Sequence, residues 1–153
     1  MNQDVIASLR DEILPHHYTR DLSHLVDDDC LLFKKGAYAC LAMPFSKVPS
    51  EDYGSQYAKA VLRKAMLCLP VLCERGLFLL YYGPYEDWES VAPRFTVDKT
   101  ALRPVILQAV HFIDPESGWN ANSRTHWGPL KFGFCGALID EIEQLGEDIQ
   151  QSA

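Results

Sequence analysis

The side chains best suited to chemistry lie in one stretch, residues 114–129, with the sequence DPESGWNANSRTHWGP. It follows a predicted strand and precedes a predicted helix, so Arg124, His126 and the free amide groups of the helix N-terminus can face an anion. Long loops without structure of their own are often functional. The candidate ligand-binding residues, for a small polar or anionic ligand, are Trp119, Arg124, His126 and Trp127. The simpler interpretation, which we favour, is a surface loop whose tryptophans cover the core.

Catalysis finds little support in the same region. Nucleophilic catalysis needs a nucleophile, a base and an orienting carboxylate, and Cys135, His126 and Asp114 supply those types. The neighbourhood of Cys135 is too apolar to indicate an activated thiol, and the sequence has no G-x-S-x-G nucleophile elbow. His111 and His126 with Asp114 match no known metal-ligand spacing. We therefore assign no catalytic residue, and we expect a binding protein rather than an enzyme.

Two further clusters raise the question of a metal. Residues 27–29 are three consecutive aspartates, which suit a hard cation such as Ca²⁺ or Mg²⁺. They lack the alternate spacing and the glycine of a calcium loop, so a solvated turn is favoured. His16 and His17 are neighbours that point in different directions in regular structure, which argues against a shared metal. The sequence predicts no metal ligand and no cofactor.

A second candidate surface lies at residues 85–89, YEDWE, where acids alternate with aromatic side chains. Tyr85 and Trp88 are the candidate interaction residues, because Trp and Tyr dominate interface energies. The acids suit a basic partner, although a solvated connection is the favoured interpretation. The net charge of −7 argues against a nucleic acid or an anionic membrane as partner. The expected partner is a protein or a second copy of the chain, as in a homodimer.

The element expected to organise the fold is the segment 49–84. Ser50 is a suitable N-cap, and apolar residues then recur at helical spacing, which predicts one long helix with a kink near Pro70. Gly76 is the expected residue just past its C-terminus. The bulky run LFLLYYG that follows predicts a strand covered on both faces.

The other predicted elements surround this unit. The sequence predicts an N-terminal helix ended by Pro15, a β-hairpin with its turn at Gly36, and a final helix ended by Gly146. The expected ranges are a helix over 4–14, a second short helix over 18–26, the hairpin over 30–43, an edge strand over 94–97, a strand over 104–114 and a helix over 129–146.

Composition limits the class of protein. The 153 residues suit one domain, and 48% of them are hydrophobic, which excludes a largely disordered chain. Charged residues interrupt every long apolar run, so no membrane segment is predicted. The first residues do not resemble a signal peptide. The five cysteines form no CxxC pair, which is typical of buried thiols in the cytoplasm.

Together these patterns predict an α+β protein with a single domain over 1–146 and a flexible C-terminal tail over 147–153. A small mixed or antiparallel sheet of about four to five strands is expected to pack against the long central helix and the N- and C-terminal helices. The expected function is that of a small, acidic, soluble protein that acts by binding a protein partner or itself. The alternative is a small-molecule-binding protein or enzyme with a pocket under the 114–129 loop. Convergence of Trp119, His126 and Trp127 on one concave pocket would favour that alternative.

Overall fold

A computed structural model describes residues 2–36, 38–47, 75–94, 105–124 and 134–152. Its centre is a six-stranded mixed sheet with the strand order β1-β2-β3-β4-β5-β6. The strands are β1 (Arg20–Asp21), β2 (Leu31–Lys35), β3 (Tyr38–Pro44), β4 (Arg75–Tyr82), β5 (Val105–Ile113) and β6 (Asn120–Arg124). The helices are α1 (Asn2–Ser8), the π-helix η1 (Leu9–Ile13), α2 (Leu14–His17), α4 (Tyr85–Trp88) and α5 (Phe134–Ser152), with short 3-10 helices η2 (Ser23–Leu25), η3 (Phe45–Lys47) and η4 (Ala92–Arg94).

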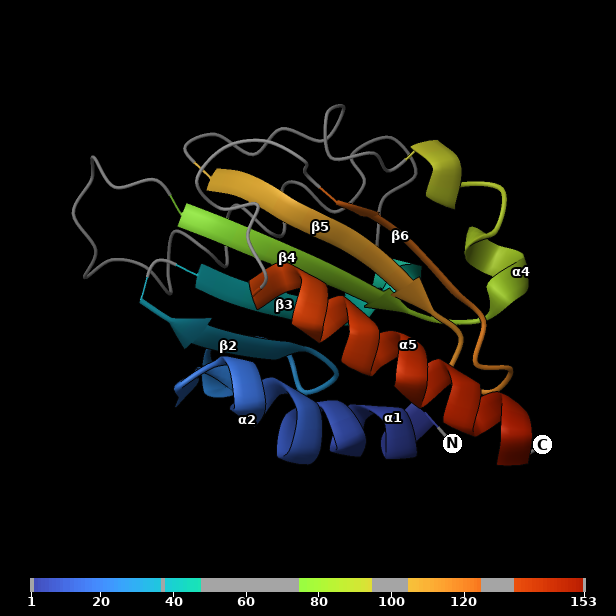
Figure 1. Ribbon diagram of the computed structural model, residues 1–153, viewed down its shortest axis with the longest axis horizontal. Coiled ribbons are helices and arrows are strands. Elements are labelled where there is room, and N and C mark those ends of the chain that lie inside the picture. Colours follow the sequence, from blue (N-terminus) through green and yellow to red (C-terminus); the bar gives the residue numbers. More distant parts are fainter. Residues whose placement is uncertain (1, 37, 48–74, 95–104, 125–133, 153) are drawn as a thin grey trace.

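Each face of the sheet carries its own hydrophobic core. The N-terminal helical segment and α5 lie side by side over one face (Figure 1). The α4 helix covers part of the other face through the buried side chain of Trp88. This mixed sheet packed by helices confirms the expected α+β class. The strand count is higher than expected, because the sequence did not predict β1 or β6.

The predicted strand over 77–83 is confirmed as β4, which pairs in parallel with both β3 and β5. Its side chains from Leu77 to Tyr82 alternate between the two cores, which explains a bulky run without polar positions. Gly76 lies inside β4, paired with Tyr38 and Ile106, so its prediction as a residue just past a helix was wrong. The predicted long helix before it falls in residues 48–74, outside the described part of the chain.

The predicted hairpin is also confirmed. Strands β2 and β3 pair antiparallel with Leu31 opposite Ala42, and Gly36 in the turn has the positive φ of 58° that favours glycine. The predicted strand over 104–114 corresponds to β5. Of the predicted edge strand over 94–97, Arg94 ends the 3-10 helix η4, and the remaining residues lie outside the described part.

Three boundaries near the ends of the chain differ from the sequence prediction. The N-terminal helical segment continues through Pro15 to His17, because proline at the first turn of α2 needs no amide partner there. Residues 18–26, predicted as a helix, contain β1 and η2, since Arg20 pairs with Lys34 at the sheet edge. The last helix does not end at Gly146: α5 continues to Ser152, so residues 147–152, predicted as a tail, are its last turns.

Candidate functional site

The turn between β5 and β6 is held by the carboxylate of Asp114. Its oxygens accept hydrogen bonds from the backbone amides of Tyr85 at 2.9 Å, Glu116 at 2.8 Å and Ser117 at 3.3 Å. Burial alone would raise the pKa of Asp114, but these hydrogen bonds outweigh it and the pKa is lowered. Asp114 therefore serves the structure: it ties the β5–β6 turn to the first residue of α4.

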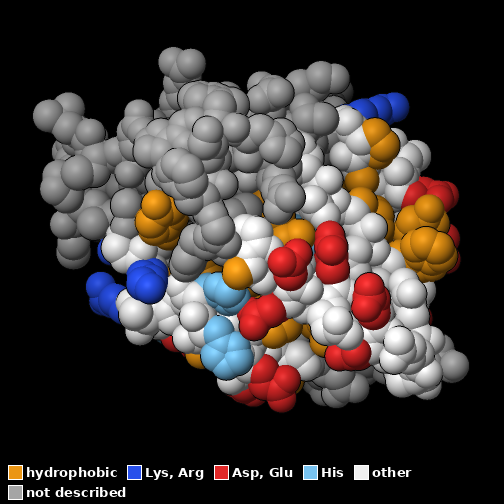
Figure 2. Space-filling model, viewed as in Figure 1, with side chains coloured by type: hydrophobic (Ala, Val, Ile, Leu, Met, Phe, Trp, Pro, Cys, Tyr) orange, Lys and Arg blue, Asp and Glu red, His pale blue; other side chains and the backbone are white. Residues whose placement is uncertain are grey.

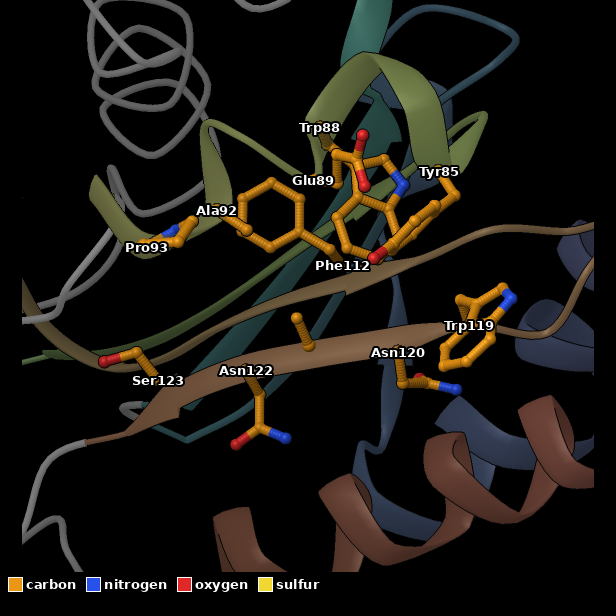
Figure 3. Close-up of a pocket in the computed structure, with 11 residues that line it drawn as sticks. Tyr85, Trp88, Glu89, Ala92, Pro93, Phe112, Trp119, Asn120, Asn122 and Ser123 are labelled. Atoms are coloured by element: carbon orange, nitrogen blue, oxygen red, sulfur yellow. The ribbon is translucent and has the colours of Figure 1, made fainter.

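This tie brings Trp119 against Tyr85. Their ring centroids lie 5.5 Å apart with planes inclined by 31°. The series continues inward, because Tyr85 meets Trp88 edge-on at 5.1 Å and Trp88 stacks on Phe112 at 5.4 Å. We call these four residues the aromatic ladder; it leads from the core to the surface (Figure 3). Its outer member, Trp119, is 55% exposed and is the only exposed large hydrophobic side chain in the described residues.

The aromatic ladder borders a groove of about 480 Å³ between the α4–η4 segment and β6 (Figure 3). The groove is lined by Tyr85, Trp88, Glu89, Ala92, Pro93, Phe112, Trp119, Asn120, Ala121, Asn122 and Ser123. Glu89 is the one charged side chain among these residues. A hydrogen bond with Glu89 raises the pKa of the Tyr85 phenol, so the groove offers a carboxylate beside an aromatic wall.

Residues from the two candidate surfaces of the sequence analysis, the 114–129 loop and the 85–89 segment, both line this groove. Trp119, from the predicted loop, and Tyr85, from the acidic segment, form one wall of the groove. Trp88 is only 1% exposed and donates its indole N–H to the Gly83 carbonyl at 2.9 Å, so it supports that wall from beneath. Arg124 is the last residue of β6, and the structure describes its backbone only. His126 and Trp127 lie outside the described residues, so convergence of the predicted set stays untested.

Sequence reasoning missed the residues of β6 and η4 that complete the groove. Residues 120–124 read NANSR, which has no alternation of apolar residues and no β-branched side chain, so no strand was predicted. Their strand conformation comes from pairing with β5, with Phe112 opposite Ala121. The one available signal was turn chemistry: Asp114 followed by Gly118, whose φ is 79°, marks a tight turn between two strands.

A buried histidine lies behind β6. His111 is fully buried, stacks on Phe78, and places its Nε2 2.6 Å from the Oδ1 of Asn120. The Nδ2 of Asn120 donates to the Gly118 carbonyl at 2.8 Å, so its Oδ1 must be the acceptor and His111 Nε2 the donor. Burial lowers the pKa of His111 to about 4, so the imidazole is neutral at neutral pH. His111 thus orients Asn120, a groove residue, from inside the sheet.

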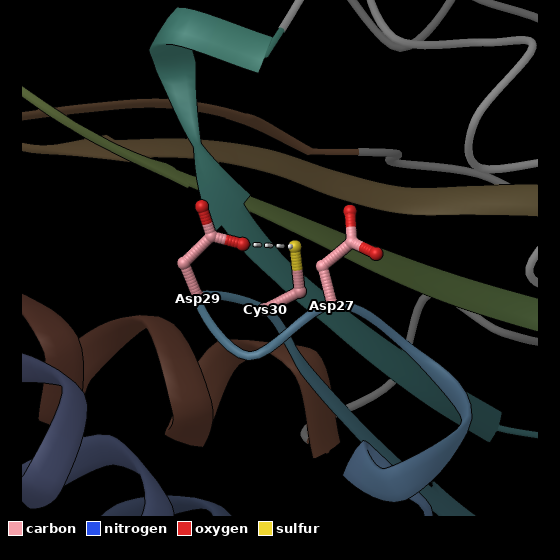
Figure 4. A group of neighbouring side chains, drawn as sticks. All are labelled: Asp27, Asp29 and Cys30. Carbon is pink, nitrogen blue, oxygen red and sulfur yellow. Dashed lines mark hydrogen bonds between the residues drawn. The ribbon is translucent and has the colours of Figure 1, made fainter.

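The aspartate cluster at residues 27–29 already holds a cation from the chain itself. The ammonium of Lys47 lies 2.7 Å from Asp27 Oδ2 and 2.6 Å from Asp29 Oδ1. Cys30 Sγ, at 3.5 Å from Asp29 Oδ1, completes the group in Figure 4. These hydrogen bonds raise the pKa of Lys47, which keeps it charged. The cluster is therefore an ion-paired turn.

Added Ca²⁺ or Mg²⁺ is expected to leave the melting temperature of the protein unchanged, because Lys47 occupies the space between the carboxylates. The Lys47→Ala variant is expected to lose less than about 1 kcal/mol of stability, since exposed ion pairs contribute little. Thermal melts with and without millimolar Ca²⁺ check both statements. A Ca²⁺-dependent rise in the wild-type melting temperature would contradict this assignment.

A cluster of two histidines and a glutamate joins α2 to α5. Glu141 of α5 places Oε1 3.5 Å from His16 Nδ1 and Oε2 in hydrogen-bond contact with His17 Nε2. Although neighbouring imidazoles were expected to point in different directions, both rings contact the same carboxylate, each through a different oxygen. Figure 2 shows histidine side chains beside acidic side chains on the face of the molecule that carries α5 and the N-terminal helices. The cluster links the N-terminal helical segment to the last helix.

The chain matches no protein-family model, no curated protein and no solved structure. Among the described helices, none combines the length and the apolar character that a membrane crossing requires.

Proposed function

We propose that this protein is a binding protein that recognises a segment of a partner protein in the groove between α4–η4 and β6. The observation that carries the proposal is the exposure of Trp119 at the mouth of this groove. An exposed tryptophan held against a second aromatic ring presents a large apolar area at little entropic cost on binding. Because Trp119 already stacks on Tyr85 in the free protein, its side chain is ordered before a partner binds.

The composition of the groove supports a protein partner of apolar and basic character. Aromatic and small apolar side chains form most of its described lining, and Glu89 adds one carboxylate. Trp and Tyr with a polar rim are typical of protein interaction surfaces. The net charge of −7 favours approach of a basic segment at low ionic strength. The alternative is a small-molecule site, since a cavity of about 480 Å³ falls within the usual range of ligand pockets.

The Trp119→Ala variant is expected to weaken partner binding about tenfold or more, because a central aromatic anchor contributes about 2 kcal/mol. Its stability should fall by less than about 1 kcal/mol, since the side chain is largely exposed. The probe is a pool of peptides selected on the wild-type protein from a phage-displayed random library. Binding of the synthesised peptides is measured by fluorescence polarisation.

Trp119→Phe is the matched control, because it keeps an aromatic ring against Tyr85 and should retain most of the affinity. Selected peptides that bind Trp119→Ala as tightly as the wild type would contradict the proposal. So would a selection that enriches no peptide at all. In that case the small-molecule alternative would be examined by screening fragments against the tryptophan fluorescence of the wild type and the Trp119→Ala variant.

A further inference from the structure

The outer edge of β6 has no strand partner among the described residues. β6 is the last strand of the sheet and pairs only with β5, antiparallel. The Asp114 amide donates to the Trp119 carbonyl at 2.9 Å, so this pair, one step beyond Ile113 and Asn120, stands at a hydrogen-bonded position of the antiparallel register. Such pairs alternate with non-bonded pairs along an antiparallel ladder. Asn120 and Asn122 therefore point their backbone N–H and C=O groups away from the sheet.

The groove runs along this edge. Successive side chains of a strand lie on opposite faces, and β6 follows this rule. Ala121 packs into the core on the α4 side, whereas the Asn122 side chain donates to Glu143 of α5 at 3.0 Å. Yet residues of both faces line the same groove, from Asn120 to Ser123. The groove therefore follows β6 along four consecutive residues, beside the positions whose backbone groups point away from β5.

We infer that the partner segment binds as an extended strand that adds to the edge of β6 and becomes a seventh strand of the sheet. The inference rests on the proposed function and names the form of the partner. Main-chain hydrogen bonds to Asn120 and Asn122 supply affinity, and alternate side chains supply specificity. The aromatic pair of Trp119 and Tyr85 lies at the end of this edge, where the β5–β6 turn leads into β6.

The two sides of the edge predict the sequence of the bound strand. On the α4 side, the small side chains of Ala121 and Ser123 lie beside Ala92 and Pro93, which leaves room for apolar side chains. On the α5 side, the Asn122 side chain contacts Glu143 of α5, and acidic side chains gather on that face of the molecule (Figure 2). Of the acidic residues of that helix, Glu143 contacts β6, whereas Glu141 contacts His16 and His17. The bound strand is therefore one in which apolar residues alternate with Lys or Arg.

The test compares two variants of one residue, Asn122→Pro and Asn122→Ala. Both lose the side-chain bond to Glu143, but only proline removes the outward N–H. Because that N–H makes no bond to β5, proline is compatible with this edge position. With the phage-selected peptides, Asn122→Pro is expected to weaken binding about tenfold, and Asn122→Ala by less than about threefold, at about 1.4 kcal/mol per factor of ten.

A second measurement leaves the protein unchanged, so it does not depend on folding of the proline variant. Each selected peptide of about ten residues, the upper length of a usual strand, is made with backbone N-methyl groups on its odd or its even positions. Only every second residue of the bound peptide would donate its backbone N–H to β6. Methylation of those positions should therefore abolish binding, and methylation of the others should not. Equal binding of both series, with binding still lost in Trp119→Ala, would overturn strand addition and leave the groove as a binding site.

A second copy of the chain is the competing occupant of the same edge. Sedimentation equilibrium of the wild-type protein tests it, with Asn122→Pro as comparison. A monomer at micromolar concentration supports an edge kept for a partner strand. A dimer that Asn122→Pro dissociates would assign the edge to self-association and overturn the inference.

Discussion

Replacement of Gly146 by alanine is expected to lower the free energy of unfolding by about 3 kcal/mol, which is the cost of severe overpacking. Helix propensity alone predicts the opposite sign, because alanine is favoured over glycine inside a helix by about 1 kcal/mol. A Cβ atom at Gly146 would lie 1.9 Å from Asn120 Nδ2 and 2.4 Å from the Gly118 carbonyl oxygen. Asn120 Nδ2 donates a hydrogen bond to that carbonyl oxygen at 2.8 Å, so neither atom can move away without breaking this bond.

The close contact between α5 and the β5–β6 turn also leaves no room for a side chain at Gly118. Gly118 has a φ of 79°, and a Cβ there would lie 2.1 Å from the Gly146 carbonyl oxygen. Urea denaturation followed by tryptophan fluorescence measures the loss in Gly146→Ala. Glu147→Ala, the next and exposed residue of α5, is the control and should change stability by less than about 0.5 kcal/mol. A Gly146→Ala protein as stable as the wild type would show that α5 and the β5–β6 turn separate easily.

Acidification from pH 6.5 to pH 4 is expected to cost the wild-type protein about 3 kcal/mol more than it costs the His111→Phe variant. Burial holds the pKa of His111 at about 4 in the folded state, against 6.5 in the unfolded chain. Between these values the unfolded state binds more protons, so stability rises with pH across the window and is lost as the pH falls. Each unit of pKa difference corresponds to about 1.4 kcal/mol.

The comparison with His111→Phe isolates this effect, because phenylalanine keeps a ring against Phe78 and cannot titrate. The pKa of Asp114 is lowered from 3.8, so its contribution is lost below the His111 window and is common to both proteins. Free energies of unfolding from urea titrations at several pH values give the two curves. Parallel curves between pH 4 and 6.5 would mean that His111 is hydrated in the folded protein.

The parts of the fold that the sequence predicts are those determined by local burial. The run from Leu77 to Tyr82 is bulky because β4 is buried between two strands and two cores, and such a run needs no knowledge of its partners. The hairpin of β2 and β3 is likewise marked by its turn at Gly36. Gly146 illustrates the opposite case. Local rules predict that it ends the helix, but it lies within α5, where the lack of a side chain makes room for Gly118.

The candidate site could be predicted only in pieces. Tyr85 and Trp119 are suitable recognition residues by type, but they come from separate segments. The hydrogen bond from the Tyr85 amide to Asp114 brings them together, and no local pattern encodes that contact. The polar residues of β6 are strand only through pairing, so the edge beside the groove had no signal in the sequence. Contacts between distant segments thus decide the site, whereas local burial decides the central strands.

The cluster of His16, His17 and Glu141 has a consequence for biosynthesis. His17 and Glu141 are 124 residues apart, so a ribosome that adds about 5–20 residues per second makes them roughly 6–25 s apart. During that interval the first helical segment lacks the part of its core that comes from Leu138 and Ile142. Its apolar stripe, with Leu9 and Leu14, is then available to a chaperone until α5 has been made and packs against it.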